Sequence, residues 1–121
     1  MPIIKTRINK NSDKFISNFE YHKSLSDNLS EKIQKIREMG SSGNIEKHKA
    51  RGKLTVRERI ELLIDKGSKF LELSEFAGMK LYDSDVPAGG IITGIITVYN
   101  QSCMVIANDA TVKGGTYFPI T

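Results

Sequence analysis

Two apolar stretches in the second half of the chain constrain its fold most strongly. Residues 91–99 are mainly β-branched or aromatic, with Gly94 among them, and residues 103–107 are almost continuously apolar. Asn100 and Gln101 lie between the stretches and predict a turn, so the pair indicates a β-hairpin. The apolar run 103–107 predicts a strand buried on both faces. Gly94 predicts a bulge or the close approach of another backbone.

A helix is expected well before the hairpin. Over residues 19–40, apolar side chains recur at steps of four, four and three, which places one stripe on a helix: Leu25, Leu29, Ile33 and Ile36. Gly40 suits the position just past its end. Residues 1–18 lack a clear period and are predicted to be a loose arm. Residues 41–53 are predicted to be a basic linker, because they contain turn formers followed by a cluster of lysines and arginine.

A second, shorter helix has a clear start signal. Thr55 and Glu58 have the spacing of a capping box, in which each side chain bonds the other residue's amide. The helix is predicted over residues 56–65, and its expected buried residues are Ile60, Leu63 and Ile64. Residues 70–73 form a short strand candidate.

The end of the sequence predicts a truncated domain. Two central apolar strands need neighbours, and this length supplies few. Pro119 suits the first position of a helix, and the chain stops two residues later.

Charge is distributed unevenly along the 121 residues. Residues 1–53 carry 12 basic and 6 acidic side chains, whereas residues 54–121 carry 6 basic and 8 acidic ones. A basic first half favours a polyanionic partner, which leaves a phosphate-bearing cofactor, a nucleic acid and an acidic subunit open. With one cysteine, an intramolecular disulfide framework and a cysteine-rich zinc module are excluded, and no ligand spacing around the two histidines indicates a metal site, so none is expected.

The sequence also bears on location. No apolar run approaches the ~18 residues that a spanning helix needs, so no membrane partner is expected. The N-terminus has no signal-peptide core, and the early acidic residues Asp13 and Glu20 argue against a mitochondrial presequence. The simplest compartment is a cytoplasm with Cys103 reduced.

Residues 50–121 resemble a known family. Residues 50–60 (ARGKLTVRERI) resemble the opening motif of carboxyltransferase β subunits of biotin-dependent acyl-CoA carboxylases, and residues 70–82 follow the same pattern. Residues 89–95 (GGIITGI) and 106–117 (IANDATVKGGTY) are similar to the 3-methylcrotonyl-CoA branch of that family. Propionyl-CoA and other acyl-CoA branches, and a non-catalytic remnant or interaction protein from a split gene, remain the alternatives.

The resemblance implies a fold class, an activity and partners. The fold would be α/β: residues 54–121 would begin a crotonase-like carboxyltransferase N-terminal domain, a spiral of ββα turns, preceded by the N-terminal helix. Such a subunit moves a carboxyl group from carboxybiotin to an acyl-CoA, in this branch 3-methylcrotonyl-CoA in leucine degradation. Biotin is carried by a partner α subunit with biotin carboxylase activity, which uses ATP and bicarbonate, and the β subunits form homo-oligomers. In a eukaryote the enzyme would lie in the mitochondrial matrix.

Few residues are candidates for a site. In the family, the Gly-rich amides that stabilise the enolates follow the segment that resembles this chain, so no catalytic residue is expected here and the chain alone is expected to be inactive. Arg51 and Lys53 are candidates for the phosphates of coenzyme A, beside the simpler interpretation of a solvated basic turn. Lys113, Gly114 and Gly115 are candidates for a phosphate cradle, beside the interpretation of a strand-to-helix turn. No RNA-binding motif is present, so no nucleic-acid partner is expected.

Overall fold

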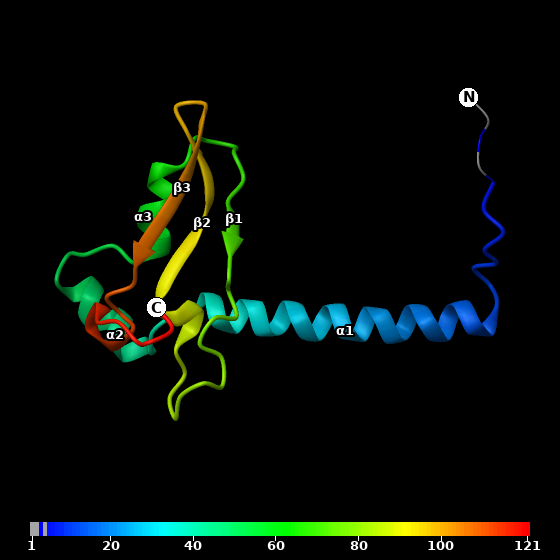
Figure 1. The fold of residues 1–121 in the computed structure, drawn as a ribbon, viewed down its shortest axis with the longest axis horizontal. Helices are drawn as coiled ribbons and strands as arrows, with labels where there is room; N and C mark the ends of the chain where they lie inside the picture. The colour runs from blue at the N-terminus through cyan, green and yellow to red at the C-terminus, as the bar shows by residue number, and fades with distance from the viewer. Residues whose placement is uncertain (1–2, 4) are drawn as a thin grey trace. The chain divides into compact units, whose positions relative to one another are not determined.

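The computed structural model describes residue 3 and residues 5–121. Its helices are α1 (Asp13–Arg37), α2 (Ser42–Ala50) and α3 (Val56–Leu63), its strands are β1 (Leu71–Leu73), β2 (Ile91–Val98) and β3 (Gln101–Asn108), and two 3₁₀ turns cover Pro87–Gly90 and Lys113–Gly115 (Figure 1). The chain divides into two compact units, residues 1–32 and residues 33–121. None of the helices in this described part is long and apolar enough to cross a membrane.

The first unit contains most of α1. The helix begins at Asp13, so the predicted loose arm over residues 1–18 is wrong for its last six residues. The reason is a local cap, since the hydroxyl of Ser12 accepts a hydrogen bond from the Phe15 amide at 3.3 Å and Asp13 adds a negative charge to the first turn. No residue of α1 is buried, and its last residue is Arg37.

Helix α2 corrects the predicted basic linker over residues 41–53. The side chain of Ser41 accepts a hydrogen bond from the Asn44 amide and caps a nine-residue helix. Lys47, His48 and Lys49 lie in its last turn, where positive charge favours the helix dipole. Residues 41–44 therefore start a helix, and the first part of the basic cluster forms the last turn of that helix.

Helix α3 confirms the predicted capping box. The Glu58 amide donates to Thr55 Oγ1 at 3.3 Å, and the Thr55 amide donates to Glu58 Oε2 at 2.7 Å. The helix ends at Leu63, two residues before the predicted end, because Ile64 is already extended. Leu63 was predicted to be buried and is 49% exposed.

Replacing Thr55 by Ala is expected to lower the free energy of unfolding by about 0.5–2 kcal/mol, because the Glu58 amide loses its acceptor. Urea unfolding followed by circular dichroism measures the change. Thr55→Ser keeps the hydroxyl and is the control. An alanine variant as stable as the serine variant would contradict the cap's contribution.

The three strands form one antiparallel sheet in the order β1-β2-β3. Strands β2 and β3 form the predicted hairpin, with Ile91 paired to Asn108 and Val98 paired to Gln101. Its turn lies at Tyr99 and Asn100, one residue earlier than predicted, and both have positive φ, 49° and 59°. This left-handed pair matches the twist of the strands.

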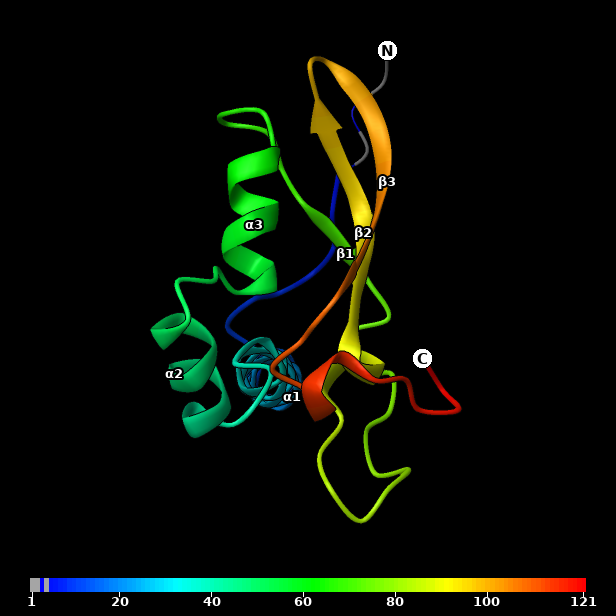
Figure 2. The same cartoon turned by 90° about the vertical axis from the view of Figure 1, so that its left-hand side faces the viewer.

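One face of the sheet packs on α3 (Figure 2). The core consists of Val56 and Ile60 from the helix and Ile92 and Ile96 from β2, all buried. The prediction that 103–107 is buried on both faces is wrong, since Met104 and Ile106 are 59% and 69% exposed. Among the described residues β3 is an edge strand, and only alternate side chains on it can face α3.

Candidate functional site

The two groups of predicted site residues lie on separate segments. Arg51 follows α2 as its C-cap, and Lys53 is exposed in the connection to α3. Lys113, Gly114 and Gly115 form the 3₁₀ turn after β3. Within residue 3 and residues 5–121, no hydrogen bond or ion pair joins the two groups. The structure therefore presents two exposed basic positions and one glycine turn.

The glycine turn is already engaged in local bonds. The Gly115 amide donates to the Val112 carbonyl at 2.9 Å, and the Gly115 carbonyl accepts from Asn108 Nδ2 at 2.7 Å. The Lys113 ammonium lies 4.1 Å from the centre of the Phe118 ring, a cation–π contact. These bonds favour the interpretation of a turn, because an amide that already has an acceptor is not free for a phosphate.

The basic segment is tied to α3 by an ion pair. Lys49 Nζ donates to Glu58 Oε1 at 2.8 Å. This bond is the largest cause that lowers the pKa of Glu58 from its ordinary value of 4.5 to about 2, and the bonds from the Thr55 amide and hydroxyl add to it. The carboxylate of the capping box is thus held ionised by its partners.

The pKa of Glu58 gives a pH prediction. Because its pKa is lowered in the folded chain, its stabilising effect is complete above the unfolded pKa, near 4.5, and is lost as the pH falls from there towards 2. We expect the stability difference between the wild type and Glu58→Gln to shrink across this window. Urea unfolding at a series of pH values measures it. A difference that stays constant from pH 5 to pH 2 would contradict the assignment.

A second ion-pair network lies between α3 and β1, and sequence reasoning missed it. Arg57 binds Glu72 through both terminal nitrogens, Nη1 to Oε2 and Nη2 to Oε1, each at 2.8 Å. The Glu72 side chain is only 3% exposed. Arg57 Nε also donates to the Arg37 carbonyl at 3.0 Å, and Arg37 Nε donates to Glu75 at 2.8 Å. The available signal was the alternation Leu-Glu-Leu in β1, which places Glu72 on the opposite face from both leucines.

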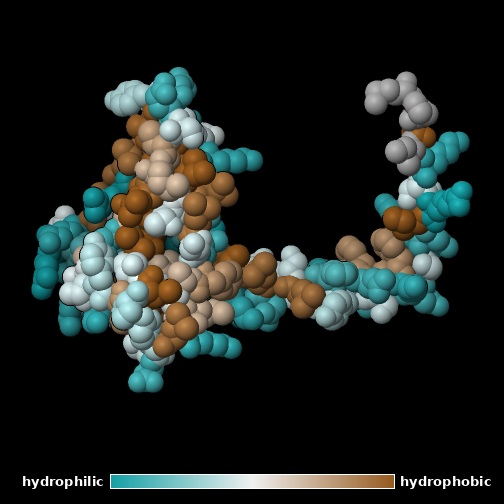
Figure 3. All heavy atoms as spheres, viewed as in Figure 1, coloured by the Kyte–Doolittle hydropathy of each residue, from teal (hydrophilic) through white to brown (hydrophobic). Residues whose placement is uncertain are grey.

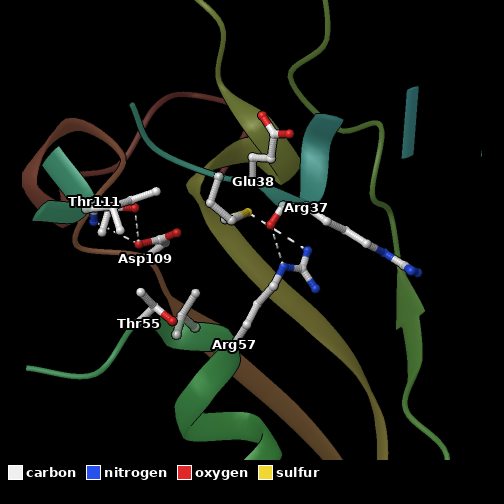
Figure 4. A pocket seen from close by; sticks show the side chains of 9 residues that line it. Arg37, Glu38, Thr55, Arg57, Asp109 and Thr111 are labelled. Carbon is white, nitrogen blue, oxygen red and sulfur yellow. Dashed lines mark hydrogen bonds between the residues drawn. The ribbon is translucent and has the colours of Figure 1, made fainter. Parts of the chain in front are cut away.

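A cavity of about 60 Å³ lies beside this network (Figure 4). It is lined by nine residues: Arg37, Glu38, Met39, Ile45, Thr55, Val56, Arg57, Asp109 and Thr111. Acyl-CoA-sized ligands need pockets of roughly 300 Å³ or more, so this cavity does not hold one. The cavity lies where the last residue of α1, the start of α3 and the turn after β3 meet.

Asp109 lies at the cavity and caps a turn. Its Oδ1 accepts from the Thr111 amide at 2.8 Å and from the Thr111 hydroxyl at 2.7 Å, and both residues are buried. Thr111 in turn accepts from the Gly40 amide and from Asn44 Nδ2. The segment after β3 is therefore fixed to the start of α2. Across the part of the chain that the structure describes, no three His, Cys, Asp or Glu side chains are placed to hold a metal ion.

The chain is similar to a known protein family and to individual members of it. The carboxyl transferase domain family matches residues 47–121. The mitochondrial methylcrotonoyl-CoA carboxylase β chain of Dictyostelium discoideum is 50% identical over 120 residues, which is 98% of this chain and 20% of that protein. This chain thus spans about a fifth of that relative's length.

Solved structures give the same assignment. The β subunit of Pseudomonas aeruginosa geranyl-CoA carboxylase matches with a TM-score of 0.82 at 36% identity, over 96% of this chain and 22% of that one. Transcarboxylase 12S, described as a hexamer, matches with a TM-score of 0.69 at 32% identity, over 75% of this chain and 18% of that one. The predicted fold, the α/β start of a crotonase-like carboxyltransferase domain with a helix before it, is confirmed. The chain belongs to the carboxyl transferase family of biotin-dependent acyl-CoA carboxylase β subunits.

Proposed function

We propose that this chain is part of a carboxyltransferase subunit that moves a carboxyl group from carboxybiotin to 3-methylcrotonyl-CoA. The observation that carries the proposal is the 50% identity to a methylcrotonoyl-CoA carboxylase β chain across 98% of this chain. A match that continues through the N-terminal helix is more specific than the domain match over residues 47–121. A geranyl-CoA acceptor is the second candidate, and the TM-score of 0.82 to a geranyl-CoA carboxylase β subunit supports it.

The part played by these residues is structural support and substrate docking. The Arg57–Glu72 pair holds α3 to β1. The Asp109–Thr111 turn, through Gly40 and Asn44, holds the end of β3 to the start of α2. Arg51 and Lys53 are exposed, and no carboxylate in the described part of the chain lies within ion-pair distance of them. Free positive charges of this kind suit the phosphates of coenzyme A. Lys113, Gly114 and Gly115 are the less favoured second contact in this proposal, because the Gly115 amide is already bonded to the Val112 carbonyl.

The proposed enzyme needs a partner. Biotin would arrive on a biotin carboxylase and carrier α subunit, which consumes ATP and bicarbonate, and the β subunits would form a homo-oligomer like the transcarboxylase hexamer. The compartment would be the mitochondrial matrix in a eukaryote, as for the Dictyostelium relative, and the cytoplasm in a bacterium.

A chimera tests the proposal. The 120 residues of the Dictyostelium β chain that match are replaced by this chain, and the product is mixed with biotin-loaded α subunit, ATP and bicarbonate. We expect turnover of 3-methylcrotonyl-CoA in preference to geranyl-CoA and propionyl-CoA. A folded, assembled chimera without turnover, or with a preference for either competitor, would refute the assignment.

The chain alone is the control for this assay. We expect no turnover above the α subunit alone, because losing even one donor to a developing enolate costs about 10²–10³ in rate. Arg51→Ala with Lys53→Ala in the chimera should raise the KM for acyl-CoA while leaving kcat nearly unchanged, if both residues bind only the phosphates.

A further inference from the structure

The side of the sheet that faces away from α3 carries a cluster of apolar side chains. The register places Leu71, Ile95 and Met104 in one row across the three strands, and Leu73, Thr93 and Ile106 in a second row on the same side. The five apolar side chains of these two rows are exposed, and we call them the open face. Figure 2 shows α3 on the other side of the strands, and Figure 3 shows hydrophobic residues gathered over the sheet on the side turned to the viewer.

Strand β1 shows that this face is not built for solvent. A sheet with one face in water places its polar residues on that face and its apolar residues on the core side. In β1 the order is reversed: Glu72 points inward and is 3% exposed, whereas Leu71 and Leu73 point outward and are 58% and 38% exposed. The inward carboxylate requires Arg57 as its partner. Such a reversal is favourable only where the outward leucines are also buried.

The free edge of β3 gives a second, independent observation. Exposed edge strands normally carry charges, prolines or bulges that prevent pairing with other chains. Strand β3 reads QSCMVIAN and contains neither a charge nor a proline, and its register with β2 is continuous over eight residues. An unprotected edge beside an apolar face is typical of a strand in the interior of a larger domain.

We propose that the open face is the docking surface for the four-fifths of a carboxyl transferase β chain that this chain does not match. This inference rests on the proposed function, because the proposed occupant is the rest of the same carboxyltransferase subunit. The occupant follows from length: the chain covers 20% of the methylcrotonoyl-CoA carboxylase relative and 22% of the geranyl-CoA carboxylase subunit. In each of those proteins, the part that matches this chain is therefore joined to a remainder about four times as long.

The chemistry of the face favours this occupant over a subunit contact. Its five side chains carry no charge, and apolar surfaces without charged residues are typical of domain cores, whereas contacts between separately stable subunits have a polar rim. A second copy of this chain is the competing occupant, and the experiment separates the two.

The first experiment measures binding in trans. The 121-residue chain is co-expressed with the tagged, unmatched four-fifths of the Dictyostelium β chain, and the complex is analysed by affinity purification and sedimentation. We expect a 1:1 complex. The double variant Met104→Lys/Ile106→Lys should weaken it at least about tenfold, because two lysines would have to be buried without partners.

Leu62→Lys is the matched control. Leu62 is 76% exposed on α3, outside the open face, so this variant adds one exposed lysine on another surface and should bind as the wild type does. Circular dichroism of each variant alone checks that the fold is kept. The proposal would be overturned if the double lysine variant bound as well as the wild type. It would also be overturned if the chain formed a stable dimer that excluded the unmatched four-fifths of the β chain.

A second measurement needs no binding partner in trans. Met104 is exposed in this chain, so peroxide should oxidise it readily, and mass spectrometry detects the sulfoxide. In the full-length chimera Met104 should be protected. Equal oxidation in both would overturn the proposal even if the chimera is active, whereas a protected Met104 in an inactive chimera would refute the acceptor assignment and leave the docking surface standing.

Discussion

Replacing Glu72 by Gln is expected to lower the free energy of unfolding by about 3 kcal/mol. The glutamine has the same shape, but it removes the negative charge that two guanidinium nitrogens of Arg57 bind at 2.8 Å. Breaking a buried pair from one side typically costs about 3–5 kcal/mol, and the lower end applies because Arg57 keeps some contact with solvent. Urea unfolding of the 121-residue chain measures the change.

A double-mutant cycle isolates the pair. Arg57→Met with Glu72→Leu removes both charges and should cost much less than the two single changes together, because no unpaired charge remains. Glu61→Gln, at an exposed position of the same helix, is the control for removing a negative charge. If Glu72→Gln costs no more than Glu61→Gln, the network does not stabilise the fold.

Features that depend on neighbouring residues were predictable from the sequence. The capping box needs only Thr55 and Glu58, three residues apart, and the hairpin needs two β-forming runs with a short turn between them. The family motifs over residues 50–117 gave the fold class, which the geranyl-CoA carboxylase structure confirms. These signals are local or are carried by contiguous sequence.

Features that depend on distant partners were not predictable. Arg57 and Glu72 are fifteen residues apart, and their pairing follows only once β1 lies against α3. The exposure of β3 likewise depends on which strands are its neighbours. An apolar run alone does not predict those neighbours. Helix α2 was missed because serine and asparagine, as at Ser41 and Asn44, are favoured both in turns and at helix starts.

The candidate site residues stay predictions. Arg51 and Lys53 were chosen for their charge, and the structure leaves them exposed, which both a phosphate contact and a solvated turn require. Only the acyl-CoA kinetics of the chimera distinguish the two. Lys113 to Gly115 are less favoured, because the Gly115 amide is already bonded to Val112.

Replacing Gly94 by Ala is expected to lower the free energy of unfolding by about 2–3 kcal/mol. A Cβ at this position would collide with the ring of Phe70 and with the carbonyl oxygen of Leu71. The ring can turn aside, but the carbonyl belongs to β1, so relief requires β1 to move away from β2. The register is continuous here, which excludes the bulge and confirms the close approach that the sequence allowed.

Gly43→Ala is the matched control for this change. Gly43 lies in α2, where a Cβ would meet nothing within 4 Å, so the substitution should raise stability by up to about 1 kcal/mol through helix propensity. The Gly94 change should also loosen β1 selectively, because the strand pressed against Gly94 is the one that carries Glu72 inward and two leucines outward. Amide exchange at Leu71–Leu73 should therefore accelerate more than exchange at Ile96–Val98. Uniform acceleration along β2 would mean that Gly94 supports the hairpin as a whole, and the link between close strand packing and the buried ion pair would be wrong.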